Sequence, residues 1–124
     1  MAFLTDRKRA EGMGSAKSGT EHHWHMQISS YALVILTPLF LLTFGPQLGN
    51  DYETVIAHFA RPWPAIICGL MVVVGMWHFR QGFQAVIDDY VSTMMTRKLC
   101  IIALACFSYG VMAAGVFALV KLAL

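Results

Sequence analysis

The sequence predicts an all-α integral membrane protein with three transmembrane helices. Of its 124 residues, 57% are hydrophobic, and the mean hydropathy of +0.59 is too high for a soluble domain of this length with an ordinary polar surface. Three apolar segments, at about 25–48, 63–87 and 99–122, are each long enough to cross a hydrocarbon core of about 30 Å. They use nearly the whole chain, so no room remains for a large water-facing catalytic domain.

Residues 1–24 form a polar arm ahead of the first apolar segment. Its glycine and serine content disfavours a stable isolated helix, so we expect a tail that orders against a partner. The arm carries four bases, Arg7, Lys8, Arg9 and Lys17. The loop at 46–62 has one, Arg61, so the positive-inside rule predicts a cytoplasmic N-terminus and an external loop. The net charge of +2 reflects this bias and gives no argument for nucleic acid.

His78 lies well inside the second apolar segment, about nine residues or on the order of 13 Å from its predicted cytoplasmic end. A histidine at that depth needs a partner, and three roles are open: axial ligand of a haem iron, proton relay, or hydrogen bond to a neighbouring helix. Gly75, Gly82 and Ala85 leave a shallow trough beside the imidazole. A flat macrocycle would fit there, although small residues at this spacing serve helix packing equally well.

A b-type haem needs a second axial ligand, and the other histidines lie at the wrong depth. His22, His23 and His25 are near the cytoplasmic surface, and His58 is in the outer loop. The two iron-bound nitrogens would be only about 4 Å apart, given metal–imidazole bonds near 2 Å. If haem is bound, its other ligand therefore comes from a second polypeptide.

Asp89 and Tyr90 stand where the second segment leaves the membrane, which is also typical of an ordinary polar boundary. A tyrosine hydroxyl can donate to a carbonyl, and a neighbouring carboxylate can orient it or accept protons, which suits a quinone headgroup. Asp89 follows His78 by about three helical turns and shares its face. Arg80 points about 200° away from His78. It is free to snorkel, pair with a carboxylate or reach a propionate.

Two motifs resemble those of one known family. Residues 78–91 (HFRQGFQAVIDDYV) are similar to the signature of the hydrophobic membrane anchor of succinate dehydrogenase, in its alphaproteobacterial and mitochondrial form. Residues 14–24 (GSAKSGTEHHW) resemble the start of the same family, at the expected distance before the first helix. The resemblance covers most of the chain, although the third segment matches only in being apolar.

The resemblance implies half of a heterodimeric helical anchor in a bacterial inner membrane. A second, cytochrome b anchor subunit would share one haem b with this chain, beneath the iron–sulfur and flavoprotein subunits. His78 would be this chain's axial ligand, and Asp89 and Tyr90 would belong to the ubiquinone site. The surroundings of haem or quinone would include Gly82, Gly75, Arg80 and Gln27. The complex would pass electrons from succinate to ubiquinone in the tricarboxylic acid cycle, and no catalytic activity is expected from this chain alone.

Two positions depart from the family pattern. Gln27 stands where the family usually has an arginine, so it keeps a hydrogen-bonding group without the charge and bidentate fork. Ser92 stands where a histidine is frequent. The alternative functions are the anchor of a fumarate reductase, a small drug or ion transporter, and a structural assembly factor. A transporter is disfavoured because the first and third segments lack an intramembrane carboxylate for proton coupling.

Overall fold

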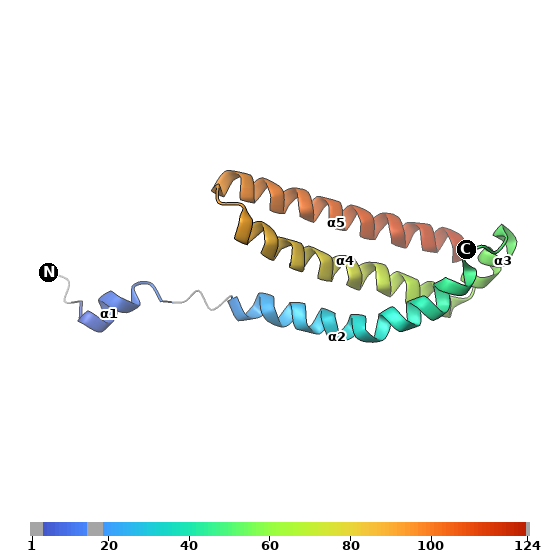
Figure 1. Cartoon of the computed structure of the whole chain (residues 1–124), viewed down its shortest axis with the longest axis horizontal. Coiled ribbons are helices and arrows are strands. Elements are labelled where there is room, and N and C mark those ends of the chain that lie inside the picture. The colour runs from blue at the N-terminus through green and yellow to red at the C-terminus, as the bar shows by residue number, and fades with distance from the viewer. Residues whose placement is uncertain (1–3, 15–18, 124) are drawn as a thin grey trace.

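The computed structural model describes residues 4–14 and 19–123, which contain helices and turns and no β-strand. The elements are α1 (Asp6–Glu11), α2 (Gly19–Phe44), the 3₁₀ helix η1 (Gly45–Gln47), α3 (Tyr52–Phe59), α4 (Pro62–Tyr90) and α5 (Met94–Ala123). Three of them, α2, α4 and α5, are long and apolar enough to cross a membrane. The predicted three-helix membrane class is therefore confirmed (Figure 1).

The N-terminal arm is more helical than its composition indicates. Thr5 caps α1 by accepting a hydrogen bond from the backbone N–H of Lys8, at 3.3 Å. α2 begins at Gly19, inside the expected arm, and Glu21 lies in its first turn, where a carboxylate favours helix formation. Hydropathy marks where the chain enters the membrane, whereas the helix itself starts earlier. Residues 15–18 of the N-terminal motif lie outside the described residues.

α4 is the central helix of the bundle and packs against α2 on one side and α5 on the other (Figure 1). The expected outer loop contains two further helices, η1 and α3, and α3 contacts both α4 and α5. Asp51 caps α3 by accepting from the hydroxyl of Thr54 at 2.7 Å and from its backbone N–H at 3.2 Å. These hydrogen bonds to Thr54 hold the pKa of the Asp51 carboxyl below its ordinary value.

The seam between α4 and α5 depends on close backbone approach. A Cβ atom added to Gly115 would lie 2.8 Å from Cγ1 of Val72, closer than real Cβ contacts. Leu104 and Ser108 of α5 are buried in the bundle, and so is Cys68 of α4. Small residues at such a seam let two spanning helices gain van der Waals contact, which drives their association in lipid.

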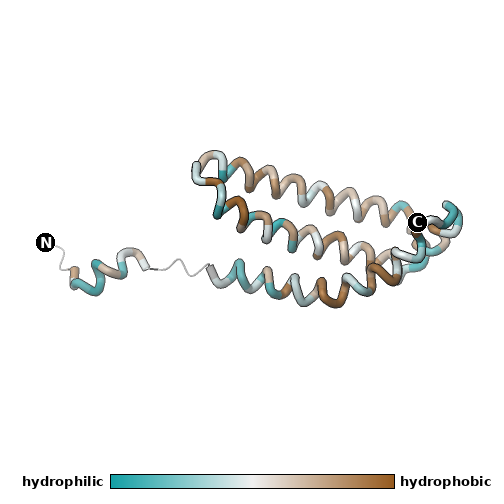
Figure 2. The backbone as a smooth tube through the Cα atoms, viewed as in Figure 1, coloured by the Kyte–Doolittle hydropathy of each residue, from teal (hydrophilic) through white to brown (hydrophobic). Residues whose placement is uncertain are grey.

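Few side chains of the spanning helices are buried inside the chain. Within the most apolar window of each helix, only 6% of α2, 17% of α4 and 11% of α5 is buried inside the chain. Figure 2 shows hydrophobic residues distributed along all three helices. An apolar surface of this extent faces lipid or another membrane subunit, because its exposure to water would be unfavourable.

Candidate functional site

His78 of α4 faces Ser29 of α2. Its Nδ1 atom lies 2.9 Å from Oγ of Ser29, whose side chain is buried. The same hydroxyl donates to the carbonyl oxygen of Met26, one turn earlier in α2, at 2.9 Å. The hydrogen bond to a neighbouring helix, one of the three roles left open for His78, is therefore present, and it ties α2 to α4.

This contact has a consequence for the second ring nitrogen of His78. A serine hydroxyl has a single hydrogen. In the tautomer with its hydrogen on Nδ1, that nitrogen donates to Oγ of Ser29, whose own hydrogen goes to the Met26 carbonyl, and Nε2 has the lone pair that a metal needs. Nε2 makes no hydrogen bond within the described part of the chain. Metal-bound histidines are held in the same way, with one nitrogen on the metal and the other donating to the protein.

An open groove runs beside His78 along α2. The residues that line it are His78, Ser30, Leu33, Val34, Thr37 and Pro38. Of the two glycines predicted to form a trough, Gly75 has open space where a Cβ atom would stand. Gly82 instead lies beside α2, with its Cβ position 3.8 Å from Cε of Met26. Open space is therefore present at Gly75, whereas the Gly82 position makes an ordinary van der Waals contact with α2.

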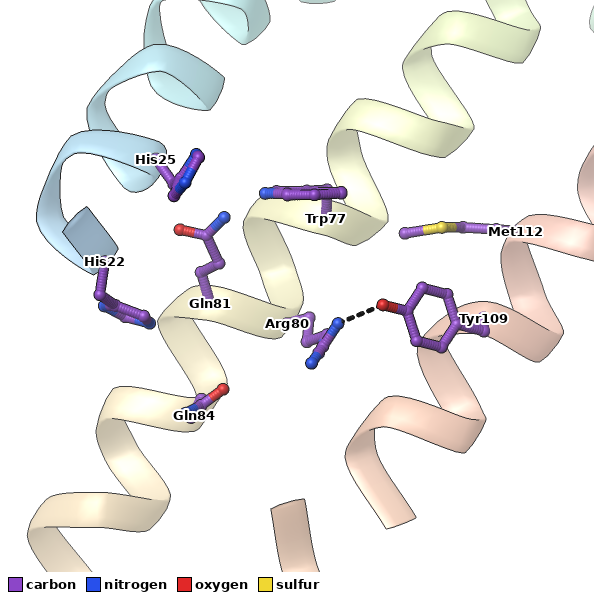
Figure 3. Close-up of a pocket in the computed structure, with 8 residues that line it drawn as sticks. All are labelled: His22, His25, Trp77, Arg80, Gln81, Gln84, Tyr109 and Met112. Atoms are coloured by element: carbon purple, nitrogen blue, oxygen red, sulfur yellow. Dashed lines mark hydrogen bonds between the residues drawn. The ribbon is translucent and has the colours of Figure 1, made fainter. Parts of the chain in front are cut away.

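Arg80 belongs to a different environment from His78. Its Nη1 atom donates to the hydroxyl of Tyr109 on α5, and its guanidinium carbon lies 5.1 Å from the centre of that ring (Figure 3). Sequence reasoning did not single out Tyr109. The available signal was a polar aromatic residue in the third apolar segment, which can serve as a partner for an arginine in the second.

The residues proposed for the quinone site lie on α2 and at the C-terminal end of α4. Asp89 and Tyr90 are exposed at the C-terminal end of α4, and the Tyr90 side chain is 84% exposed. Gln27, on α2, is half-buried. None of the three makes a side-chain hydrogen bond to another described residue. Twelve residues separate His78 from Tyr90 along one helix, which corresponds to roughly 18 Å.

The chain has no multi-ligand metal site in its described part. No group of three or more His, Cys, Asp or Glu side chains there could hold an ion, and Cys68, Cys100 and Cys106 are free. A structural zinc site needs four ligands, whereas a haem iron takes one axial ligand from each face. A single imidazole with one free nitrogen fits the second kind of centre.

The fold and site define a class: a membrane protein with three spanning helices, two of which are joined by a histidine–serine hydrogen bond. The family model described as succinate dehydrogenase/fumarate reductase transmembrane subunit matches residues 2–117. The chain belongs to this family, as the two motifs indicated.

Curated relatives agree with the family. The succinate dehydrogenase hydrophobic membrane anchor subunit of Paracoccus denitrificans is 47% identical over 124 residues, which cover 100% of this chain and 95% of the relative. The subunit of the same name from Rickettsia bellii is 35% identical over 107 residues, or 86% of this chain and 85% of the relative. No solved structure matches the chain. The chain is thus a membrane anchor subunit of the succinate dehydrogenase family and a multi-pass protein of the bacterial inner membrane.

Proposed function

We propose that this chain supplies one axial ligand of a haem b and part of the ubiquinone site of a succinate:ubiquinone oxidoreductase. The observation that carries the proposal is the Ser29–His78 hydrogen bond, because it engages Nδ1 and leaves Nε2 of His78 without a partner among the described residues, beside an open groove. When bound, haem b supplies a one-electron carrier. The relatives named as succinate dehydrogenase subunits favour this direction over fumarate reduction.

The chain's own residues hold and orient the two redox groups. Nε2 of His78 binds the iron, while Ser29 fixes the tautomer and the ring orientation. Tyr90 donates a hydrogen bond to a quinone carbonyl, and Asp89 orients the phenol or accepts protons. Gln27 provides an uncharged hydrogen bond near the same membrane surface.

The proposal requires partner subunits. This chain offers one axial nitrogen, so a second, cytochrome b anchor subunit supplies the other and covers part of the outward apolar surface. The iron–sulfur and flavoprotein subunits lie on the cytoplasmic side, next to Tyr90. The bases of the arm support this orientation, with the N-terminus in the cytoplasm. The chain alone has no catalytic activity, and expressed alone it should be unstable or free of haem.

Absorbance spectra of the co-expressed complex test the haem assignment. His78→Ala should abolish or strongly weaken the reduced b-type band, because the iron loses one axial nitrogen. His23→Ala is the matched control: it removes an exposed imidazole near the start of α2, and the spectrum should stay that of the wild type. A spectrum and midpoint potential unchanged in His78→Ala would remove His78 as the ligand.

A further inference from the structure

We propose that the cavity around Arg80 binds the phosphodiester headgroup of an anionic glycerophospholipid. The cavity has a volume of about 150 Å³ and lies between α2, α4 and α5. Its lining residues are His22, His25, Trp77, Arg80, Gln81, Gln84, Tyr109 and Met112 (Figure 3). None of them belongs to the groove at His78 or to the Asp89–Tyr90 pair, so this site is additional to the proposed redox function.

The positive charge of Arg80 in this cavity favours binding of an anion. Arg80 is permanently protonated and lies within a spanning helix, where a charge is costly unless it is compensated. All seven acidic residues lie in the described part of the chain, and none forms an ion pair with Arg80. Its partner is the uncharged hydroxyl of Tyr109. A guanidinium has five N–H donors, so it can bind the oxygens of a phosphodiester while it keeps this contact.

The remaining polar groups favour a headgroup that carries a hydroxyl. The side-chain oxygen of Gln81 is buried and accepts no hydrogen bond from the described residues. It needs a donor, which the phosphodiester itself cannot offer and a glycerol hydroxyl can. An ammonium headgroup would also donate, but the cavity contains no carboxylate to pair with it. Trp77 and Met112 provide an apolar wall for the glycerol backbone of the lipid.

The position of the cavity along the helices suits a lipid. α4 has 29 residues and is roughly 43 Å long, against a hydrocarbon core of about 30 Å. If α4 extends equally beyond both faces of the hydrocarbon core, the backbone of Arg80 lies about 8 Å inside the core. Its long side chain can reach from this depth toward the headgroups. His22 and Gln84 continue the lining toward the same end of the bundle. Basic pockets between spanning helices are known binding sites for acidic lipid headgroups.

Native mass spectrometry of the purified, delipidated complex, titrated with phosphatidylglycerol, tests the proposal. Arg80→Gln should weaken the tightest phosphatidylglycerol site by about tenfold or more, the loss expected for one charge-assisted contact. Lys98→Gln is the matched control, because it removes an equal charge from an exposed position near the start of α5, outside the cavity lining. Its affinity should stay within about twofold of wild type. Equal affinity in Arg80→Gln, or an equal loss in Lys98→Gln, would overturn the site.

A second variant keeps the test valid if Arg80→Gln does not assemble. Gln84→Glu places a carboxylate one turn after Arg80, where it can pair with the guanidinium and occupy the anion site. We expect this variant to assemble and to lose the tight phosphatidylglycerol site. Retained tight binding would contradict the proposal. Inorganic phosphate in large excess should not displace the lipid, and displacement would reassign the cavity to a free anion.

Discussion

The two sides of α4 differ in how they are held to their neighbours. Toward α5, Gly115 lets Val72 approach so closely that a single methyl group would not fit. Toward α2, the contact includes the partly buried hydrogen bond between His78 and Ser29, with an open groove beside it. The first side combines the close contact at Gly115 with the hydrogen bond from Arg80 to Tyr109, so its polar groups are paired within the chain. The second side leaves Nε2 of His78 without a partner among the described residues and has open space beside it. The α2 side is therefore where the proposed haem would bind.

The largest effect should come from a substitution in the proposed quinone site that leaves both interfaces of α4, with α2 and with α5, unchanged. Tyr90→Phe keeps the exposed ring and deletes one hydrogen bond to the quinone, which should cost about 1–3 kcal/mol. This is roughly a fivefold to hundredfold loss of quinone reductase efficiency. Succinate oxidation with an artificial acceptor that bypasses the membrane should stay near wild type. Unchanged quinone reduction in Tyr90→Phe would contradict the quinone assignment. A parallel fall in both assays would also count against it, because it would indicate lost assembly instead of a lost contact in the site.

A methyl group at the packed seam should affect stability. Gly115→Ala places Cβ against Val72, and overpacking of this kind costs about 1–3 kcal/mol. Thermal unfolding of the purified complex measures the loss. The matched control is Gly69→Ala on α4, where the new Cβ would lie 3.8 Å from Cδ1 of Leu119, an ordinary contact. Equal stability of Gly115→Ala and Gly69→Ala would show that the seam is not closely packed.

A glycine-to-alanine substitution at Gly75, where there is open space, should distinguish an effect on haem binding from an effect on helix packing. Gly75→Ala meets no atom within 4 Å, so the chain should fold as well as wild type or gain up to about 1 kcal/mol of helix propensity. If the macrocycle lies in that space, the methyl group should lower the haem content of the complex. Haem content is read from the absorbance per mole of complex. Wild-type content in Gly75→Ala would mean that the haem lies elsewhere.

The sequence predicts the three spans, and it singles out His78 as a candidate ligand, because both signals are local. A run of apolar residues identifies a span, and a histidine within it stands out without knowledge of its neighbours. The partners Ser29 and Tyr109 were not found, because each hydrogen bond depends on how two helices align, which side-chain packing decides. The predicted direction of Arg80, away from His78 on α4, agrees with the structure. Its hydrogen-bond partner, Tyr109 of α5, could not be predicted in the same way.

The amphipathic helix α3 shows a different reason for a missed element. The segment at 46–62 is predicted as a loop, because it lies between two spans and contains polar residues. The local signal was nevertheless present: Asp51 stands three residues before Thr54, the usual spacing of a helix N-cap and its partner. Apolar residues at Val55, Ile56 and Phe59 then follow a helical spacing. A search for spanning helices overlooks a helix of 8 residues.

The haem midpoint potential in Ser29 variants tests most directly whether the α2 side of α4 orients a haem ligand. The hydrogen bond from Nδ1–H makes the imidazole a stronger donor to iron and favours the oxidised haem. Ser29→Ala should therefore raise the midpoint potential by tens of millivolts, roughly the equivalent of one hydrogen bond of about 0.5–1.5 kcal/mol. Ser29→Thr keeps the hydroxyl and should restore the wild-type value. A potential unchanged in Ser29→Ala, or shifted equally in both variants, would contradict the account.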